Sequence, residues 1–546
     1  MSELDPAGVG SGALLRSSSV MAVGTIVSRL LGFARISVLA AAIGIRTVGG
    51  TFAVANTVPN IIYILLAGGV LNAVFVPQLV RAMKQPDAGK AYADRLLTLS
   101  ALVLAAVTLV ATLAAPLIVR VYVGGRLSAA DVALATLFAF WCLPQIFFYG
   151  IYTMFGQVLN ARGSFGPMMW APIVNNLVGI ATGLVFIATA DVDFLDSGSV
   201  SGAEAALLAG GTTLGVALQA LVLLPVLRAR GFAWRPRFDF RGAGLGKAGE
   251  LAKWTLLFVL VNQLAYLVVV RLATGAGKEA ALAHQTAADY VAYANGYLVL
   301  MLPHSIITVS VVTALLPRMS AAASDGRLSD LRDDLSTGWR LTAVVLVPAS
   351  VAMLVLGSDL TTVLFGGAGT ADARFAGHVV QAFALGLLPF SAQYLALRAF
   401  YAQEDTRTPF LMQCAIAAVN VALAVLAAAV LPARWVVVGL AGAYVLTYLI
   451  GLAVSLAVLR RRLGGVDGAR VARTYARLIL AGTAAGLVGF GVERAVLAWL
   501  GYGVSGSLVA LVVAGGVIGA VFLALTRALH VVEMTALVAL VRGRAA

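Results

Sequence analysis

Residues 504–528 have the sequence VSGSLVALVVAGGVIGAVFLALTRA, in which Arg527 is the only charged residue. A helix of about 20 mainly apolar residues spans the hydrocarbon core of a bilayer, so this stretch predicts a transmembrane helix. Across the 546-residue chain, 61% of residues are hydrophobic and 11% are charged. Soluble globular proteins are about 45–50% apolar and about 25% charged. The composition therefore excludes a soluble enzyme and a disordered protein.

Thirteen further stretches are long and apolar enough to span a bilayer, which predicts an all-α integral membrane protein with about fourteen transmembrane helices. A short final stretch, His530 to Arg544, is expected to lie along the membrane surface. The predicted spans are 15–44, 51–80, 94–122, 131–160, 168–190, 203–228, 249–273, 283–316, 338–366, 375–402, 409–431, 435–459, 472–498 and 504–528.

The basic residues between the spans predict how the chain is oriented. The net charge is +14, and arginines collect in connections after even-numbered spans, for example at 228–247 and 460–470. The connection at 191–204, after an odd-numbered span, holds four acidic residues and no Lys or Arg. Cytoplasmic loops carry an excess of Lys and Arg, so this alternation predicts that both termini lie in the cytoplasm. It also explains the positive charge without a nucleic-acid partner.

Two pairs of short motifs recur at a nearly constant spacing. Phe75–Arg81 ends the second span and Leu315–Met319 ends the eighth, with their prolines 240 residues apart. Leu159–Pro167 and Tyr401–Pro409 follow the fourth and tenth spans, 242 residues apart. An offset of six helices preserves orientation, so the pattern predicts two six-helix lobes in parallel pseudo-twofold repeat. The alternative is that both pairs are common helix-ending motifs. Repeat-built transporters bind substrate between their halves and alternate access by rocking one half against the other.

The repeat leaves the last two spans outside the two lobes and places a basic linker between the lobes. The predicted segments are a cytoplasmic N-terminal segment (1–14), an N-terminal lobe (15–230), a basic cytoplasmic linker (231–248), a C-terminal lobe (249–462), two further helices (463–530) and an amphipathic tail (531–546).

Two arginines lie inside the apolar first span, where charges are costly and usually face a cavity or a partner. Thr25, Ser28, Gly32 and Arg35 follow helical spacing and form a small polar stripe that ends in a guanidinium. Arg29 lies about 100° off this stripe and roughly 9 Å from Arg35 along the helix axis. Arginine forms bidentate bonds to phosphate and stays charged when buried, so the pair could hold a pyrophosphate or pass an anion from one to the other. The alternative is that either side chain reaches an interface or a helix C-terminus.

Polar residues in two other spans are further candidates for binding a substrate. Asn56, Asn60 and Tyr63 share one face of the second span, where Pro59 interrupts the backbone hydrogen bonds. Their side chains could bind sugar hydroxyls, or they could satisfy the carbonyl that the proline frees and pack against neighbouring helices. Asn295 in the eighth span is the remaining candidate.

The sequence lacks the motifs of common catalytic and energy-coupling sites. It contains no G-x-x-x-x-G-K-[ST] loop, no His/Cys/Glu cluster with metal-ligand spacing and no recognisable Ser-His-Asp arrangement. No enzymatic activity, no cofactor and no metal are therefore expected. Transport would draw on a substrate gradient, an ion gradient or the membrane potential.

Four stretches resemble motifs of the MurJ (MviN) family of lipid II flippases, within the multidrug/oligosaccharidyl-lipid/polysaccharide exporter (MOP) superfamily. They are Ser28–Arg35 (SRLLGFAR), Ala55–Asn60 (ANTVPN), Gly68–Pro77 (GGVLNAVFVP) and Phe400–Pro409 (FYAQEDTRTP). The family has fourteen helices, as predicted here, and the Arg-rich, Lys-poor composition resembles that of actinobacterial members.

The resemblance implies that Arg29 and Arg35 line a cavity and contact a lipid-linked pyrophosphate. The chain also departs from the family pattern. Ile36 follows the second arginine where the family has an acidic residue, and Tyr63 stands where the family has an arginine. Span eleven contains no carboxylate and span seven contains only Glu250 at its edge, which argues against sodium coupling.

The implied function is movement of lipid II from the inner to the outer leaflet of the bacterial cytoplasmic membrane by alternating access. The implied partners are an undecaprenyl-type lipid-linked oligosaccharide and the bilayer, with cell-division or elongation proteins as further candidates. A monomer is expected. The alternatives are a flippase for another polyprenyl-linked saccharide, a multidrug/cation antiporter with Asp289 as its candidate carboxylate, and a non-transporting cell-wall scaffold.

Overall fold

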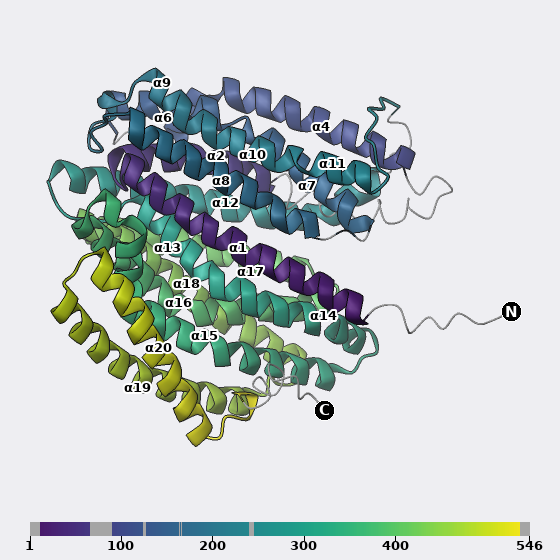
Figure 1. The fold of residues 1–546 in the computed structure, drawn as a ribbon. Helices are drawn as coiled ribbons and strands as arrows, with labels where there is room; N and C mark the ends of the chain where they lie inside the picture. Colours follow the sequence, from purple (N-terminus) through teal and green to yellow (C-terminus); the bar gives the residue numbers. More distant parts are fainter. Residues whose placement is uncertain are drawn as a thin grey trace. The chain divides into compact units, whose positions relative to one another are not determined.

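The structure is a computed structural model that describes residues 11–65, 90–123, 127–162, 164, 166–239 and 245–534. Within these ranges every regular element is a helix. The chain divides into two compact units, Met1–Leu260 and Val261–Ala546, and the boundary lies within one long helix, α12 (Leu245–Leu282) (Figure 1). The predicted fold class, an all-helical membrane protein, is confirmed.

Unit 1 contains the helices of the first six predicted spans. They are α1 (Ser11–Ile43), α2 (Thr47–Leu65), α4 (Lys90–Leu113), α5 (Ala115–Val123), α6 (Ala129–Cys142), α7 (Gln145–Ala161), α8 (Gly166–Thr189), the 3₁₀ turn η3 (Ser197–Ser199), α9 (Gly202–Ala205), the π turn η4 (Ala206–Gly210), α10 (Gly211–Leu221) and α11 (Leu223–Ala229).

Unit 2 contains the second part of α12 and all later helices. They are α13 (Tyr290–Pro303), the π turn η5 (His304–Thr308), α14 (Val309–Ser324), α15 (Leu328–Phe365), the 3₁₀ turn η6 (Gly366–Ala368), α16 (Thr370–Ala402), α17 (Arg407–Val430), α18 (Ala433–Arg462), α19 (Gly468–Leu500) and α20 (Val504–Ala528).

All fourteen predicted spans overlap these helices, and α20 has the predicted bounds. Twelve of the described helical stretches are long and apolar enough to cross a membrane by length and composition. The helices α1 and α2 are not among the twelve, and the predicted second span continues past the described end of α2. Multiple spans are therefore shown, whereas the count of fourteen stays a prediction.

The predicted start of the eighth span at residue 283 is wrong, because α13 begins at Tyr290. Residues 283–289 (AHQTAAD) form the connection from α12, and four of these seven residues are polar. Asp289 ends this connection in an extended conformation, and its side chain accepts a hydrogen bond from the Tyr290 N–H. A carboxylate in this position caps the first turn and fixes where the helix begins.

Proline interrupts three of the predicted spans. α4 ends just before Pro116, α6 ends just before Pro144, and α10 ends at Leu221, four residues before Pro225. A proline has no N–H, and its ring clashes with the carbonyl four residues earlier, so the helix ends or bends there. The fourth span is therefore built from two helices, α6 and α7, rather than one.

The eighth span contains a π turn, η5, directly after Pro303. His304 opens this turn and is buried, with its Nδ1 atom 2.9 Å from the Ser391 hydroxyl. The rings of Phe390 and Tyr394 meet the imidazole edge-on, with centroids 4.6 and 4.9 Å away. These contacts make His304 part of the packing between α16 and the turn.

Small residues bring the helices of unit 1 close together. α1 packs against α8, and α8 packs against α10. A Cβ atom added to Gly183 would lie 2.7 Å from Cγ1 of Val38, and one added to Gly211 would lie 2.5 Å from the Thr182 side chain. Small residues at helix contacts let backbones approach in membrane proteins, where dispersion replaces the hydrophobic effect between helices.

In unit 2, α16 is the central helix and packs against α15 and α18. The last two helices, α19 and α20, lie side by side and both contact α15 (Figure 1). The two helices that follow the predicted repeat therefore belong to unit 2.

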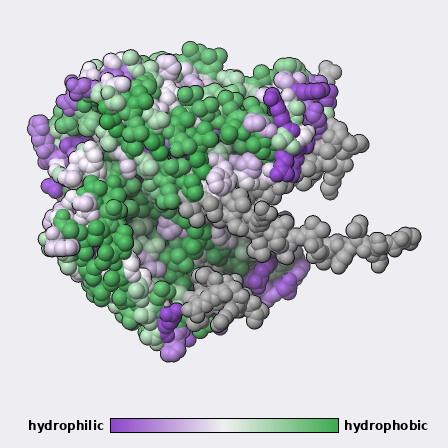
Figure 2. Space-filling view, viewed as in Figure 1, coloured by the Kyte–Doolittle hydropathy of each residue, from purple (hydrophilic) through white to green (hydrophobic). Residues whose placement is uncertain are grey.

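The surface of both units carries large exposed apolar side chains, among them Leu109, Leu487 and Val512, each more than half exposed. Figure 2 shows a mostly hydrophobic visible face, with hydrophilic residues gathered toward the helix ends. Apolar patches of this extent are uncommon on soluble monomers and agree with a surface that faces lipid.

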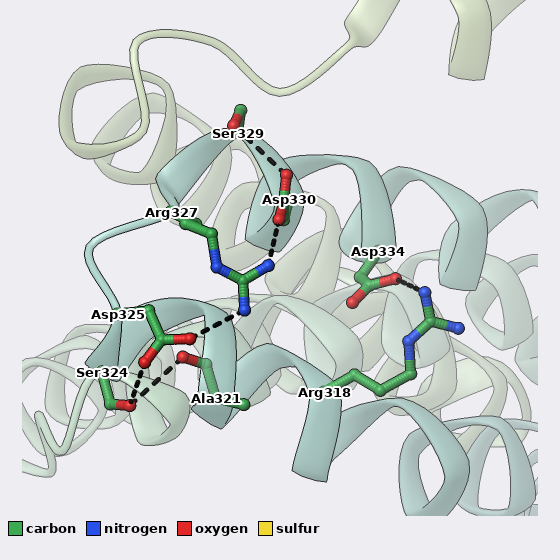
Figure 3. A network of polar contacts seen from close by, with 8 residues as sticks. All are labelled: Arg318, Ala321, Ser324, Asp325, Arg327, Ser329, Asp330 and Asp334. Atoms are coloured by element: carbon green, nitrogen blue, oxygen red, sulfur yellow. Dashed lines mark hydrogen bonds and ion pairs between the residues drawn. The ribbon is translucent and has the colours of Figure 1, made fainter.

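Ion pairs fix the turn between α14 and α15 (Figure 3). Arg327 binds Asp325 at 2.8 Å and Asp330 at 2.5 Å, and Arg318 binds Asp334 at 2.9 Å. The hydrogen bond from Arg327 holds the pKa of Asp325 below its usual value. These arginines belong to a connection that the charge pattern places in the cytoplasm.

Candidate functional site

Arg35 points from α1 into the interior of unit 1. Its aliphatic part lies over Gly179 of α8, where an added Cβ atom would be 2.5 Å from the Arg35 Cδ atom. Its Nη1 atom lies 3.5 Å from Oδ1 of Asn175, and its Nε atom is buried without a hydrogen-bond partner in the described part of the chain. No carboxylate in that part lies within 4 Å of the guanidinium. Among the described residues, Arg35 is therefore a cation without a neighbouring carboxylate.

The polar stripe that precedes Arg35 is a helix contact. Asn176 of α8 donates a hydrogen bond of 2.8 Å from Nδ2 to the Ser28 carbonyl, and the same amide lies against Gly32. Farther along, Gly24 meets the ring of Trp170. The stripe thus packs α1 against α8. At its end, Arg35 contacts the polar side chain of Asn175.

Tyr63 of α2 meets polar side chains of α7. Its hydroxyl lies 2.5 Å from Oγ1 of Thr153, and its ring stacks on Tyr149 with centroids 5.3 Å apart. Tyr149 is also within electrostatic range of Arg35. Tyr63 therefore contacts Tyr149, and Arg35 lies in the same part of unit 1.

Asn175 extends this group toward α10, because its Nδ2 atom donates a hydrogen bond of 3.0 Å to Oε1 of Gln219. We call the side chains that surround Arg35 the unit 1 polar cluster. It consists of Arg35, Tyr63, Tyr149, Thr153, Asn175 and Gln219.

Asn56 lies elsewhere in unit 1 and joins a second polar group. Its Oδ1 atom accepts a hydrogen bond of 3.1 Å from Nε2 of Gln145, which also lies 3.2 Å from Oγ1 of Thr213. The Thr213 hydroxyl donates to the Trp141 carbonyl at 2.6 Å, beside the break at Pro144. Side chains of neighbouring helices thus satisfy backbone groups that the proline frees, as membrane interiors require.

The other three predicted residues are not part of the unit 1 polar cluster. Arg29 is half-buried on α1, and Asn60 is exposed on α2. Asn295 belongs to unit 2, where its Nδ2 atom donates to the Val291 carbonyl of its own helix at 2.9 Å. Such a bond satisfies the amide locally and leaves the Oδ1 atom as its remaining acceptor.

Tyr149, Thr153 and Gln219 were not singled out from the sequence. Hydroxyl residues occur throughout apolar spans, so the sequence gives no sign of which ones face a buried cation. A buried amide inside a span is the one usable signal, because unsatisfied amides are costly in hydrocarbon. That signal applies to Gln219, which is 5% exposed.

The stretch Phe400–Pro409 contains the connection between α16 and α17. Asp405 accepts hydrogen bonds from the Thr408 N–H at 2.9 Å, from the Thr408 hydroxyl at 2.5 Å and from Nη1 of Arg462 at 2.7 Å. The Arg462 guanidinium also lies 5.2 Å from the centre of the Phe400 ring. Partial burial opposes ionisation of Asp405, but the hydrogen bonds from Thr408 and Arg462 outweigh it and hold its pKa below the usual value.

Two observations limit what else the described helices can bind. Asp289, the candidate carboxylate for cation transport, caps α13 and packs against Gly277. Among the described residues, no group of three or more His, Cys, Asp or Glu side chains could hold a metal ion.

The fold is the one found in solved MATE and MurJ structures. A solved inward-facing multidrug resistance MATE family transporter of this superfamily matches with a TM-score of 0.62 and 16% identity, over 81% of this chain and 96% of that one. A solved lipid II flippase MurJ in an inward closed conformation matches with a TM-score of 0.67 and 16% identity, over 93% of this chain and 99% of that one.

A sequence model of the family described as lipid II flippase MurJ matches residues 39–514, so this chain belongs to that family. A probable lipid II flippase MurJ of Haemophilus influenzae is 27% identical over 404 residues, which cover 70% of this chain and 75% of the relative. One from Bdellovibrio bacteriovorus is 25% identical over 489 residues, or 87% of each chain. The resemblance predicted from the sequence motifs is confirmed. Membership in this family also confirms the prediction that the chain is a transporter rather than an enzyme. Arg29 and Arg35 precede the matched range.

Proposed function

We propose that this chain is a lipid II flippase that moves the lipid-linked peptidoglycan precursor from the inner to the outer leaflet by alternating access. Membership in the MurJ family supports the substrate class, and the MOP-type fold supports the transport mechanism. The observation that carries the proposal is the Arg35 guanidinium, which has no carboxylate partner among the described residues, since a diphosphate would supply a negative charge beside it.

Arg35 and Arg29 are proposed to bind the diphosphate. Each charge-assisted hydrogen bond would contribute about 1.5–3 kcal/mol. Tyr63, with its hydroxyl on Thr153, is proposed to orient the headgroup beside Arg35. Asn56, Asn60 and Asn295 are proposed to contact sugar or peptide groups, for which neutral amides offer both donors and acceptors.

The surroundings of the protein follow from the charge pattern and the substrate. We propose that it lies in the bacterial cytoplasmic membrane as a monomer, with both termini in the cytoplasm and with cell-division or elongation proteins as partners. The membrane potential is the proposed driving force, because one elementary charge across 100 mV is worth about 2.3 kcal/mol.

The test is a flipping assay with the purified protein in liposomes. Labelled lipid II is placed in one leaflet, and its appearance in the other is followed with and without an imposed potassium diffusion potential. A second polyprenyl-diphosphate saccharide serves as the comparison substrate. Faster flipping of lipid II than in empty liposomes supports the proposal.

Two outcomes would contradict this proposal. If the protein moved the comparison saccharide but not lipid II, the proposed substrate would be wrong and the other polyprenyl-diphosphate saccharide would take its place. No movement of either lipid, by protein that is monodisperse and oriented, would remove flipping as the function. Depletion in the host gives an independent measurement, because loss of the protein should reduce lipid II on the outer face.

A further inference from the structure

Unit 2 contains a cavity of about 400 Å³ that is lined by four of its helices, α15, α16, α18 and α19, and by the connection before α13. Its polar lining includes Thr286, Ser358, His378 and three arginines, Arg374, Arg434 and Arg494. A volume of this size falls within the range of small-molecule sites in proteins, roughly 300–1,000 Å³. None of these residues belongs to the unit 1 polar cluster or to the candidates discussed above.

The three arginines of this cavity are held differently. Arg374 lies 3.7 Å from the fully buried Asp359, which itself accepts a hydrogen bond of 2.9 Å from Ser507. Arg494 pairs through Nε with the buried Glu493 at 3.3 Å. Arg374 and Arg494 therefore each have a carboxylate partner, whereas the third arginine has none among the described residues.

That third arginine is Arg434. Its guanidinium lies over the rings of Phe375 and Trp435, with 5.3 and 5.4 Å between its central carbon and the ring centres. In the described part of the chain no carboxylate lies within 4 Å of it, and its buried Nε atom has no hydrogen-bond partner. Arg374 likewise has a buried Nη1 atom without a hydrogen bond. The aromatic rings hold the Arg434 guanidinium in place, while its buried Nε donor stays without a partner among the described residues.

Two helix N-termini meet the same cavity. α16 begins at Thr370 and contributes Ala371 and Arg374, and α18 begins at Ala433 and contributes Arg434. Unsatisfied N–H groups make a helix N-terminus partly positive, so a cation in the first turn is unfavourable by itself. Arg434 is the second residue of its helix, so only an anion in front of it would turn this arrangement into a favourable one.

The position of the cavity sharpens this argument. The charge pattern predicts that this end of α16 and α18 faces the outside of the cell, where loops of membrane proteins are poor in arginine. Three arginines around one cavity at that end therefore need a reason other than topology.

We propose that this cavity is a binding site for a phosphate-class oxyanion, with Arg434, Arg374 and Arg494 as its ligands. Arginine forks match the oxygens of a phosphate or diphosphate in bidentate geometry. The Ser358 and Thr286 hydroxyls add neutral donors around the anion. The occupant is either a lipid headgroup or a soluble phosphate, since both present the same group.

The test measures binding to the full-length protein in a maltoside detergent without added lipid. One arm titrates inorganic pyrophosphate by equilibrium dialysis. The other adds phosphatidylglycerol to the delipidated protein and counts retained lipid by native mass spectrometry. The variants are Arg434→Gln and Arg494→Gln, each checked for a monodisperse elution profile. Arg461→Gln is the matched control, because Arg461 is exposed at the opposite end of α18.

Arg434→Gln is expected to weaken binding at least tenfold and Arg494→Gln several-fold, whereas Arg461→Gln should match the unaltered protein. Binding of pyrophosphate identifies a soluble phosphate as a ligand, and binding of phosphatidylglycerol alone identifies a lipid headgroup. Failure of both probes, or equal binding by all variants, would overturn the proposal. The measurement does not use lipid II, so it can fail or succeed independently of the proposed flippase activity.

Discussion

The two units use different residues to stabilise the connections before α8 and α17, which occupy corresponding places in the predicted repeat. α8 and α17 are both 24 residues long and begin 241 residues apart, at Gly166 and Arg407. In unit 1, Arg162 precedes this helix and donates to the Arg230 carbonyl after α11 at 3.2 Å. In unit 2, the arginine is instead at the end of α18, as Arg462, and the connection supplies Asp405. If the two units are related by the predicted repeat, the starts of the helices and the ends that are joined are kept, whereas the residues that join them differ.

The interiors of the units differ in how they treat buried charge. In unit 2, Arg374 has a carboxylate beside it, and Arg340 is paired with Glu533. In the described part of unit 1, Arg35 has the neutral amide of Asn175 as its hydrogen-bond partner and no carboxylate within 4 Å. A cation with a carboxylate neighbour stabilises structure, whereas one without leaves its charge for a ligand. By this criterion Arg35 is the candidate in unit 1 for contacting the transported anion, just as Arg434 in unit 2 is the candidate for the proposed oxyanion.

The largest expected effect tests that difference directly. Arg35→Ala should lower lipid II flipping about 10- to 100-fold, because it removes charge-assisted bonds worth about 1.5–3 kcal/mol. Arg35→Lys should recover part of the rate, since it keeps the charge but loses the fork. Flipping in liposomes is the measurement.

Arg228→Ala is the matched control, because Arg228 is exposed in the last turn of α11. It should flip lipid II at the unaltered rate. If Arg35→Ala at normal membrane levels flips lipid II as fast as this control, the proposed role of Arg35 is wrong.

Two glycines sharpen the comparison of packing. A Cβ atom at Gly377 in unit 2 would collide with the backbone of Ser358, whereas one at Gly179 in unit 1 would meet the flexible Arg35 side chain. Gly377→Ala should therefore lower the free energy of unfolding by about 1–3 kcal/mol. Gly179→Ala should lower flipping more than stability, since Arg35 can shift.

The measurement is the thermal midpoint of the detergent-purified protein. Gly442→Ala is the reference, because nothing lies within 4 Å of an added Cβ there, and alanine favours helix by up to about 1 kcal/mol. A Gly377→Ala protein as stable as Gly442→Ala would show that α15 and α16 are not in close contact at this point.

Asp405→Ala should destabilise unit 2 by about 1 kcal/mol, because it removes the cap of α17 and the partner of Arg462. The pKa of Asp405 is lowered in the folded protein, so its contribution is present above the ordinary value of 3.8 and is lost as the pH falls through the lower folded value. The difference from the unaltered protein should therefore persist at pH 5 and shrink below 3.8.

Hydrogen exchange of residues 401–412 between pH 5 and pH 3 measures this effect. A gap that stays constant over this range would contradict the ionised, hydrogen-bonded state of Asp405.

The smallest effect is expected for the corresponding contact in unit 1. Arg162→Ala removes an exposed hydrogen bond to a carbonyl and a contact with Phe232, so the free energy of unfolding should change by about 0.5 kcal/mol or less. Thermal unfolding beside Asp405→Ala gives the comparison. A larger loss in Arg162→Ala than in Asp405→Ala would reverse the ranking of the two connections.

Much of the fold follows from the sequence, because apolar length alone decides what crosses a bilayer. The bounds of α20 were predicted without error, and α8 begins two residues before its predicted start. The predicted start of α13 is wrong, since the polar residues His284, Gln285 and Thr286 belong to a connection and the helix begins only after the cap at Asp289. The break at Pro144 follows from proline chemistry, yet composition alone fuses α6 and α7 into one span.

The candidate site could be predicted only in part. Arg35 stands out because a charge in an apolar span needs a partner, and Tyr63 stands out because it shares a helix face with Asn56 and Asn60. The contact of Tyr63 with Tyr149 depends on packing between α2 and α7, which one-dimensional spacing does not contain. The cavity arginines of unit 2 escape notice for another reason. Arg434 resembles any charge at a helix end until the fold brings it beside Arg374.

The π turn after Pro303 changes how α13 and α14 should be numbered against each other. It accommodates one additional residue, so positions beyond Thr308 are rotated by about 100° relative to an unbroken α-helix. A helical wheel drawn through residues 290–324 as one helix would assign lipid-facing residues of α14 to the interior. Scanning mutagenesis of this span must therefore shift its register by one position at His304.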